Sequence, residues 1–273
     1  MNGGVTPGRV VFPSRVCVSV GHSNPETLLN LADIEAGRGE SFFEFCLEFL
    51  NNPQDGPDTV REFLRCWPQA CIIVTCRRGE RNLHCSIPEQ LQLLDASVGA
   101  GACGIDVEIE TARHARAWMA SIGHRCFRIV SYHNYQCCPA LEPVIQELES
   151  APADIIKVAV RAQGRETIGQ LLRAAETCAR TNLMLAMGPE GLPTRIMAPI
   201  LGRSFTYASP AGHAGTASGQ PDSRTLREIY RLDELDSNTR FVFDSGVAGD
   251  REPPAEGTNA VCIPWPAGLC NGR

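Results

Sequence analysis

Lysine is almost absent from this chain. Of its 25 basic residues only Lys157 is a lysine, and the other 24 are arginine. Arginine supplies positive charge but holds its proton too tightly to act as a neutral amine, whereas lysine can lose its proton and attack a carbonyl. The single lysine is therefore a candidate for covalent chemistry.

The chain also lacks long apolar runs and an excess of positive charge. No stretch reaches about 18 consecutive apolar residues, so the sequence predicts no transmembrane helix. The net charge is -6 and the sequence pI is ≈ 5.6, which argues against nucleic-acid or polybasic membrane partners. The first residues lack the layout of a signal peptide, so we expect a cytoplasmic protein.

The 13 cysteines lack the spacing of a metal site. Zinc ligation needs four ligands at recognisable spacing, and the dense pair Cys137 and Cys138 has no matching cluster. The cysteine number is odd and the positions are scattered. Several lie in apolar runs, where cysteine serves as a small hydrophobe, namely Cys17, Cys71, Cys76 and Cys126. We therefore predict reduced thiols and no metal.

Short apolar runs alternate with helical patterns almost from end to end. Runs of four to eight residues rich in Val and Ile are typical of parallel strands buried on both faces. The predicted strands are residues 16–20, 42–49, 71–76, 104–109, 126–132, 154–160, 182–187 and 204–207. The predicted helices are residues 25–36, 57–66, 86–96, 111–122, 139–148, 166–178, 193–201 and about 223–235.

Eight strand–helix units in about 220 residues are typical of a (β/α)8 TIM barrel. A doubly wound open sheet is the alternative, but residues 21–24 (GHSN) lack its glycine-rich first turn. We predict an N-terminal extension over residues 1–14, the barrel over 15–236, and an irregular tail over 237–273. The tail is dense in proline and glycine from Val247 onward.

The carboxyl ends of barrel strands are where catalytic groups project. Lys157 lies in an apolar strand, where a buried ammonium must find a partner or lose its proton unless its head reaches water. His133 belongs to the neighbouring strand and can move protons for an imine on this lysine. Arg195, near a helix N-terminus, suits a substrate carboxylate.

Several motifs, in the same order along the chain, resemble those of type I 3-dehydroquinate dehydratases. They are residues 127–134 (FRIVSYHN), 154–159 (DIIKVA), 186–195 (AMGPEGLPTR), 202–208 (GRSFTYA) and 217–220 (ASGQ). The resemblance covers about residues 15 to 235.

The resemblance implies a carbon–oxygen lyase that dehydrates 3-dehydroquinate to 3-dehydroshikimate in aromatic amino acid biosynthesis, the shikimate pathway. It implies that Lys157 forms an imine (a Schiff base) with the substrate ketone, that His133 moves protons, and that no metal or organic cofactor is needed. Substrate contacts would come from Ser19, Glu44, Arg77, Arg195, Thr216 and Gln220, with Glu80, Asp106 and Glu108 in supporting positions.

The chain departs from the family pattern at several positions. Residues 44–48 read EFCLE where the family usually has Glu-x-Arg-x-Asp, so Cys46 replaces an arginine that helps bind substrate. Glu80 falls one place early and no Gly-Gly pair follows it, and Thr216 occupies the place of the closing serine. Losing an arginine anchor predicts weaker substrate binding.

The sequence leaves open the origin of the tail, two alternative activities and the oligomeric state. Residues 239–243 (TRFVF) and 246–250 (GVAGD) resemble the opening of a shikimate dehydrogenase, which some lineages fuse behind the dehydratase, but no Rossmann fingerprint follows. A class I aldolase-type lyase and a barrel that binds without turnover remain alternatives. We expect a small-molecule substrate as partner, with no nucleic acid and no membrane, and leave open a homodimer.

Overall fold

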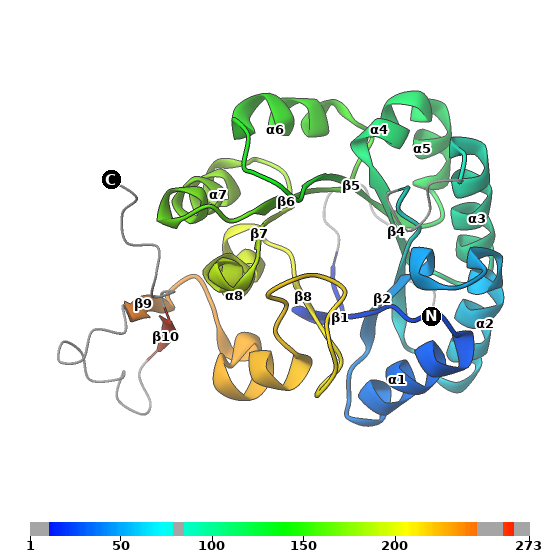
Figure 1. The fold of residues 1–273 in the computed structure, drawn as a ribbon, viewed down its shortest axis with the longest axis horizontal. Coiled ribbons are helices and arrows are strands. Elements are labelled where there is room, and N and C mark those ends of the chain that lie inside the picture. Colours follow the sequence, from blue (N-terminus) through cyan, green and yellow to red (C-terminus); the bar gives the residue numbers. More distant parts are fainter. Residues whose placement is uncertain (1–10, 79–84, 245–258, 265–273) are drawn as a thin grey trace.

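The structure is a computed structural model that defines residues 11–78, 85–244 and 259–264. Eight parallel strands form one sheet in the order β7-β6-β5-β4-β3-β2-β1-β8, and helices surround them (Figure 1). Because β8 pairs with β1, the sheet curls round into the predicted (β/α)8 barrel.

The barrel elements alternate along the chain, except that two short helices lie between the fourth and fifth strands and that, among the described residues, the helices after the eighth strand are only short π and 3-10 turns. The strands are β1 (Val16–Val20), β2 (Phe42–Cys46), β3 (Cys71–Thr75), β4 (Gly104–Glu108), β5 (Phe127–Asn134), β6 (Ile155–Arg161), β7 (Asn182–Met187) and β8 (Thr206–Ala208). The helices are α1 (Pro25–Gly37), α2 (Gly56–Cys66), α3 (Ile87–Gly99), α4 (Ile109–His114), α5 (Arg116–Ile122), α6 (Leu141–Ser150), α7 (Arg165–Thr177) and α8 (Leu192–Leu201).

The seam between β7 and β8 is joined outside the regular ladder. The backbone N–H of Asn182 donates to the carbonyl of Gly202 at 2.9 Å. The hydroxyl of Ser204 donates to the carbonyl of Asn182 at 2.5 Å. These bonds close the ring at the amino ends of the two strands.

Local signals in the sequence set several helix starts. The side chain of Asn24 accepts from the backbone N–H of Thr27, and Pro25 follows as the first helical residue of α1. Ser86 and Glu89 form the predicted capping box at the start of α3. The predicted helix over residues 111–122 is instead two helices, because Ala115 leaves the helical conformation at φ -114° and ψ 26°.

The floor of the barrel is aromatic. Phe12 lies in the predicted N-terminal extension, yet its ring is 5.0 Å from that of Phe205, which is 4.8 Å from the ring of Phe42. Ile73 and Ile129 are buried in the same interior cluster. The amino-terminal end is thus filled by apolar side chains, and polar interior groups are left for the carboxyl-terminal end.

The prediction that all cysteines are reduced is wrong for one pair. Cys71 and Cys103 form a disulfide with a Cα–Cα distance of 5.7 Å. They stand at the amino ends of the adjacent strands β3 and β4, which brings two residues 32 positions apart within bridging range. The ten other described cysteines form no disulfide.

The tail is more regular than predicted. β9 (Arg240–Asp244) and β10 (Ala260–Pro264) pair in parallel as a separate sheet. Val261 and Ile263 are buried, and the carbonyl of Ala260 accepts from the guanidinium of Arg231. No helix among the described residues is long and apolar enough to cross a membrane.

Candidate active site

Lys157 lies inside the barrel with 4% of its surface exposed, so it does not reach water. Its Nζ donates to Asp106 Oδ2 at 2.8 Å and lies 4.0 Å from Glu44 Oε1. The Tyr207 ring completes its surroundings, with the centroid 4.2 Å from Nζ. Of the two predicted outcomes for a buried lysine, the structure shows the first, because Lys157 has a carboxylate partner.

Asp106 is shared between two cations. Besides Lys157, it accepts from Arg77 Nη2 at 3.0 Å. Burial alone would raise the pKa of this carboxyl, but Lys157 and Arg77 outweigh burial and hold the pKa well below its usual range. Asp106 therefore remains a carboxylate and a fixed counter-ion in the barrel interior.

Arg77 forms ion pairs with three carboxylates. In addition to Asp106, its guanidinium lies 3.4 Å from Glu48 and 3.7 Å from Glu44. Burial opposes its charge, yet these acids raise its pKa, so Arg77 stays charged. It is predicted to contact substrate and it does line the cavity, but most of its donors already hold the carboxylate cluster together.

His133 shares the inward face of the sheet with Lys157. Ser131 on β5 pairs with Lys157 on β6, and His133 pairs with Ala159. His133 therefore lies two residues nearer than Lys157 to the carboxyl ends of the strands, on the same face of the sheet. Burial first, and then the nearby cations, lower the pKa of His133 well below 6.5. Its Nδ1 is buried with no hydrogen-bond partner in the described part of the chain. The imidazole is therefore neutral and able to accept a proton.

Arg195 is a buried cation that has no counter-ion among the residues the structure describes. It lies in the first turn of α8, 2% exposed, and within the described part of the chain its guanidinium makes one hydrogen bond, from Nη2 to the Ser218 carbonyl at 3.5 Å. No carboxylate of the described residues forms a salt bridge with it, and Nε has no partner there. Burial lowers its pKa to about 10. Such a group favours an anionic ligand.

Ser19, Thr216 and Gln220 form a chain of hydrogen bonds. The Ser19 hydroxyl donates to Glu44 and lies 2.8 Å from the Thr216 hydroxyl. Thr216 donates to Gln220 Oε1 at 3.2 Å. The Nε2 of Gln220 is buried and has no partner among the described residues, so it can still donate to a ligand.

A cavity of about 70 Å³ joins these groups. It is lined by Glu44, Arg77, His133, Tyr135, Lys157, Ala159, Leu185, Met187, Arg195, Tyr207, Thr216, Ala217 and Gln220. This volume is small beside the about 300–1,000 Å³ of typical ligand pockets.

Three predicted site residues that the structure describes, Ser19, Asp106 and Glu108, do not line this cavity. Ser19 stands behind its wall, bonded to Glu44. Glu108 instead accepts from the Arg78 backbone N–H at 2.7 Å and from Gln90 at 2.8 Å, so it fixes the end of β3. Glu80 lies outside the described residues. Asp106 reaches the site through its bond to the lysine.

Two aromatic residues of the site were not singled out from the sequence. Tyr207 on β8 packs against Lys157, and Tyr135 stacks on His133 with ring centroids 6.1 Å apart. Both lie within or beside segments that carry the family resemblance. Successive side chains of a strand point to opposite faces, and this alternation along β8 could have assigned Tyr207 to the barrel interior.

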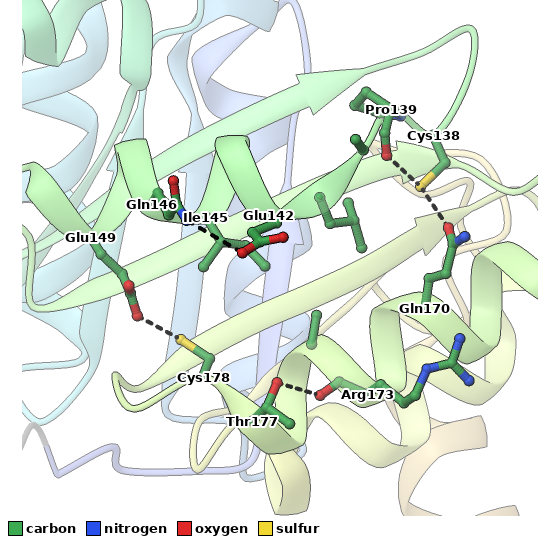
Figure 2. A pocket seen from close by; sticks show the side chains of 13 residues that line it. Cys138, Pro139, Glu142, Ile145, Gln146, Glu149, Gln170, Arg173, Thr177 and Cys178 are labelled. Carbon is green, nitrogen blue, oxygen red and sulfur yellow. Dashed lines mark hydrogen bonds between the residues drawn. The ribbon is translucent and has the colours of Figure 1, made fainter.

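A larger hollow lies outside the barrel, between α6 and α7. Figure 2 shows it as a groove, and its volume is about 680 Å³. Cys138 and Cys178 lie at its two ends and hydrogen-bond to Gln170 and Glu149, respectively. Among the described residues, no lysine or histidine lines the groove, and its one arginine, Arg173, is exposed. Its size therefore does not make it the reaction site.

The fold and the site together define a class of protein, a (β/α)8 barrel with a buried lysine paired to a carboxylate in its interior. The type I 3-dehydroquinase family model matches residues 16–237. This chain therefore belongs to the type I 3-dehydroquinase family, which confirms the resemblance seen in the sequence.

Individual relatives agree with the family assignment. The chain is 28% identical over 218 residues to a 3-dehydroquinate dehydratase of Dehalococcoides mccartyi, covering 76% of this chain and 92% of the relative. The 3-dehydroquinate dehydratase structure from Geobacillus kaustophilus superposes with a TM-score of 0.71 at 22% identity, covering 80% of this chain and 90% of that one. A dehydroquinate dehydratase and shikimate dehydrogenase structure from S. pombe, 21% identical with a TM-score of 0.62, covers 85% of this chain and 47% of that chain.

Proposed function

We propose that this chain is a carbon–oxygen lyase of the shikimate pathway that dehydrates 3-dehydroquinate to 3-dehydroshikimate through an imine on Lys157. One observation carries the proposal: a buried amine, an imidazole with a free nitrogen and an unpaired guanidinium line the same cavity. A keto acid supplies the two groups that this set lacks, a carbonyl for the amine and a carboxylate for the guanidinium.

Binding comes first in the proposed sequence. The substrate carboxylate pairs with Arg195, which has no other counter-ion among the described residues, and accepts from the free Nε2 of Gln220. These contacts orient the substrate ring so that its ketone faces Lys157. Lysine attacks a carbonyl as the neutral amine, and the neutral His133 is the base on the same face of the sheet that can accept a proton from it.

The iminium then supplies the activation. It withdraws electrons from the adjacent carbon, so that carbon loses its proton to His133. The electron pair moves to form the new C=C bond as the hydroxyl one carbon further leaves, and the imidazolium returns the proton to it as water. Asp106 remains beside the nitrogen throughout as the counter-ion of the cationic imine. Hydrolysis of the imine releases the enone.

Borohydride reduction in the presence of 3-dehydroquinate tests the proposal. The chain has one lysine, so the N-terminus is the only other amine, and a single peptide digest assigns the adduct. We expect a reduced adduct on Lys157 and the absorbance of a conjugated enone in the unreduced reaction. Lys157→Ala should lose both. Enone formation by Lys157→Ala at the wild-type rate would refute the imine mechanism.

The alternatives give different results in the same assay. An adduct without the enone would indicate a barrel that binds without turnover, as the Cys46 substitution suggests. Cleavage into smaller carbonyl products would indicate an aldolase-type lyase. The cytoplasmic location, the absence of nucleic-acid partners and the homodimer stay predictions from the sequence.

A further inference from the structure

Tyr207 contributes a hydroxyl that the mechanism above does not use. Its ring is 4% exposed, packs edge-on against Phe205 at 5.2 Å between centroids, and lines the active-site cavity. The hydroxyl oxygen is buried and has no hydrogen-bond partner among the described residues. A phenylalanine would fill the ring space without leaving a desolvated hydroxyl unpaired. The unpaired hydroxyl therefore indicates a hydrogen bond to an atom of a bound ligand.

The position of the ring limits which ligand atom this is. Lys157 Nζ lies over the ring, 4.2 Å from its centroid. A tyrosine oxygen is about 2.8 Å from its own ring centre, which puts it about 5 Å from Nζ. In a carbinolamine, the oxygen is about 2.4 Å from the nitrogen through their shared carbon, and an O–H···O bond adds about 2.7 Å. These two lengths together also span about 5 Å.

We propose that the Tyr207 hydroxyl donates a hydrogen bond to the oxygen of the substrate ketone as Lys157 attacks it, and so acts as a catalytic residue in forming and hydrolysing the imine. This rests on the proposed function of the site. The Nζ lone pair forms the C–N bond while the C=O π pair moves to oxygen, where the tyrosine stabilises the developing charge. A proton then passes from nitrogen to that oxygen through His133. A second proton from the imidazolium lets the oxygen leave as water.

The electrostatics suit a donor that keeps its proton. Burial first, and then Glu44 and Asp106, raise the pKa of Tyr207 well above 10. The phenol therefore stays protonated, and the proton that travels is the one that His133 carries. Ser131 has the other buried hydroxyl beside the lysine without a described partner, but it does not line the cavity.

The test compares wild type, Tyr207→Phe and Ser131→Ala in a rapid-quench experiment with borohydride and 3-dehydroquinate. We expect Tyr207→Phe to form the Lys157 adduct about 10²-fold more slowly, the usual effect of removing one such donor. kcat should fall in proportion, and the isotope effect with substrate deuterated at the proton-losing carbon should fall toward 1 because imine formation becomes rate-limiting. Ser131→Ala should behave as wild type, and thermal unfolding should show both variants folded.

The outcomes separate the two proposals. If wild type forms no adduct, the imine mechanism itself fails. If wild type forms it and Tyr207→Phe forms it equally fast, the role of the hydroxyl is refuted. A slower kcat with the full isotope effect retained would also refute it, because the hydroxyl would then act in the dehydration step.

Discussion

Replacing Arg195 by methionine should weaken substrate binding and stabilise the fold. Methionine keeps an unbranched apolar stem and removes the guanidinium. Hydrogen bonds to charged groups are each worth about 1.5–3 kcal/mol, so losing a bidentate pair with the carboxylate costs about 3–4 kcal/mol. The Kd for 3-dehydroquinate should rise about 10²- to 10³-fold.

The effect on stability has the opposite sign, because the Arg195 guanidinium is buried with no counter-ion in the described segments of the substrate-free protein. Burial lowers the pKa of Arg195 from its ordinary value to about 10. At about 1.4 kcal/mol for each pKa unit, the buried charge destabilises the substrate-free fold by about 3 kcal/mol. Lost packing of the guanidinium offsets part of this gain. A net gain of 1 kcal/mol would raise Tm by about 2–4 °C in a protein of this size.

Calorimetric titration with substrate and thermal unfolding without it measure the two effects. Arg173→Met, an exposed arginine on α7, is the matched control and should change neither. Arg195→Lys keeps a buried positive charge, so it should keep the destabilisation of the substrate-free fold. It should recover only part of the substrate binding, since an ammonium lacks the planar fork that matches a carboxylate. Unchanged Kd together with a lower Tm for Arg195→Met would show that this arginine is structural.

The remaining predictions concern four other parts of the chain. Because the pKa of His133 is lowered, its neutral form persists well below pH 6.5, so kcat/KM should fall only as pH drops through that lowered value; His133→Ala should lose about 10²- to 10⁴-fold in kcat. Asp106→Asn leaves two buried cations without their shared carboxylate and should lower the free energy of unfolding by about 3–5 kcal/mol in a urea titration. Reducing the disulfide between Cys71 and Cys103 opens a loop of 32 positions and should cost about 3–4 kcal/mol, so dithiothreitol should lower the Tm of wild type but not of Cys71→Ser; an unchanged Tm would mean that the thiols are already reduced. Cys46→Arg should lower KM for 3-dehydroquinate, and no change would show that this position does not limit binding.

Much of the fold could be read from the sequence because buried parallel strands are apolar on both faces. The predicted bounds of β1 and β7 match the structure to the residue. β5 runs further than predicted, since His133 and Asn134 are polar yet still pair with β6. The disulfide could not be predicted, because its partners lie on separate strands and only the barrel brings them together.

The contacts inside the site were harder to predict than its members. Asp106 and Lys157 are 51 residues apart and lie on β4 and β6, with β5 between them, so only the curvature of the barrel makes them a pair. The sequence placed Asp106 in a supporting position, whereas it is the direct counter-ion of the lysine. The missing counter-ion of Arg195 is equally invisible in a sequence, because it depends on every neighbour in space.

The cysteine at position 46 changes the charge balance around the lysine. Its thiol is 3.5 Å from Glu44 and contributes no positive charge where the family usually has an arginine. Three buried carboxylates then face two cations, Arg77 and Lys157. The imbalance shows at Glu48, where burial raises the pKa of the carboxyl, Arg77 opposes this and Glu44 adds to it. A raised pKa at Glu48 is the direction expected where a cluster of carboxylates lacks one cation, and Arg77 still holds Asp106 beside the lysine.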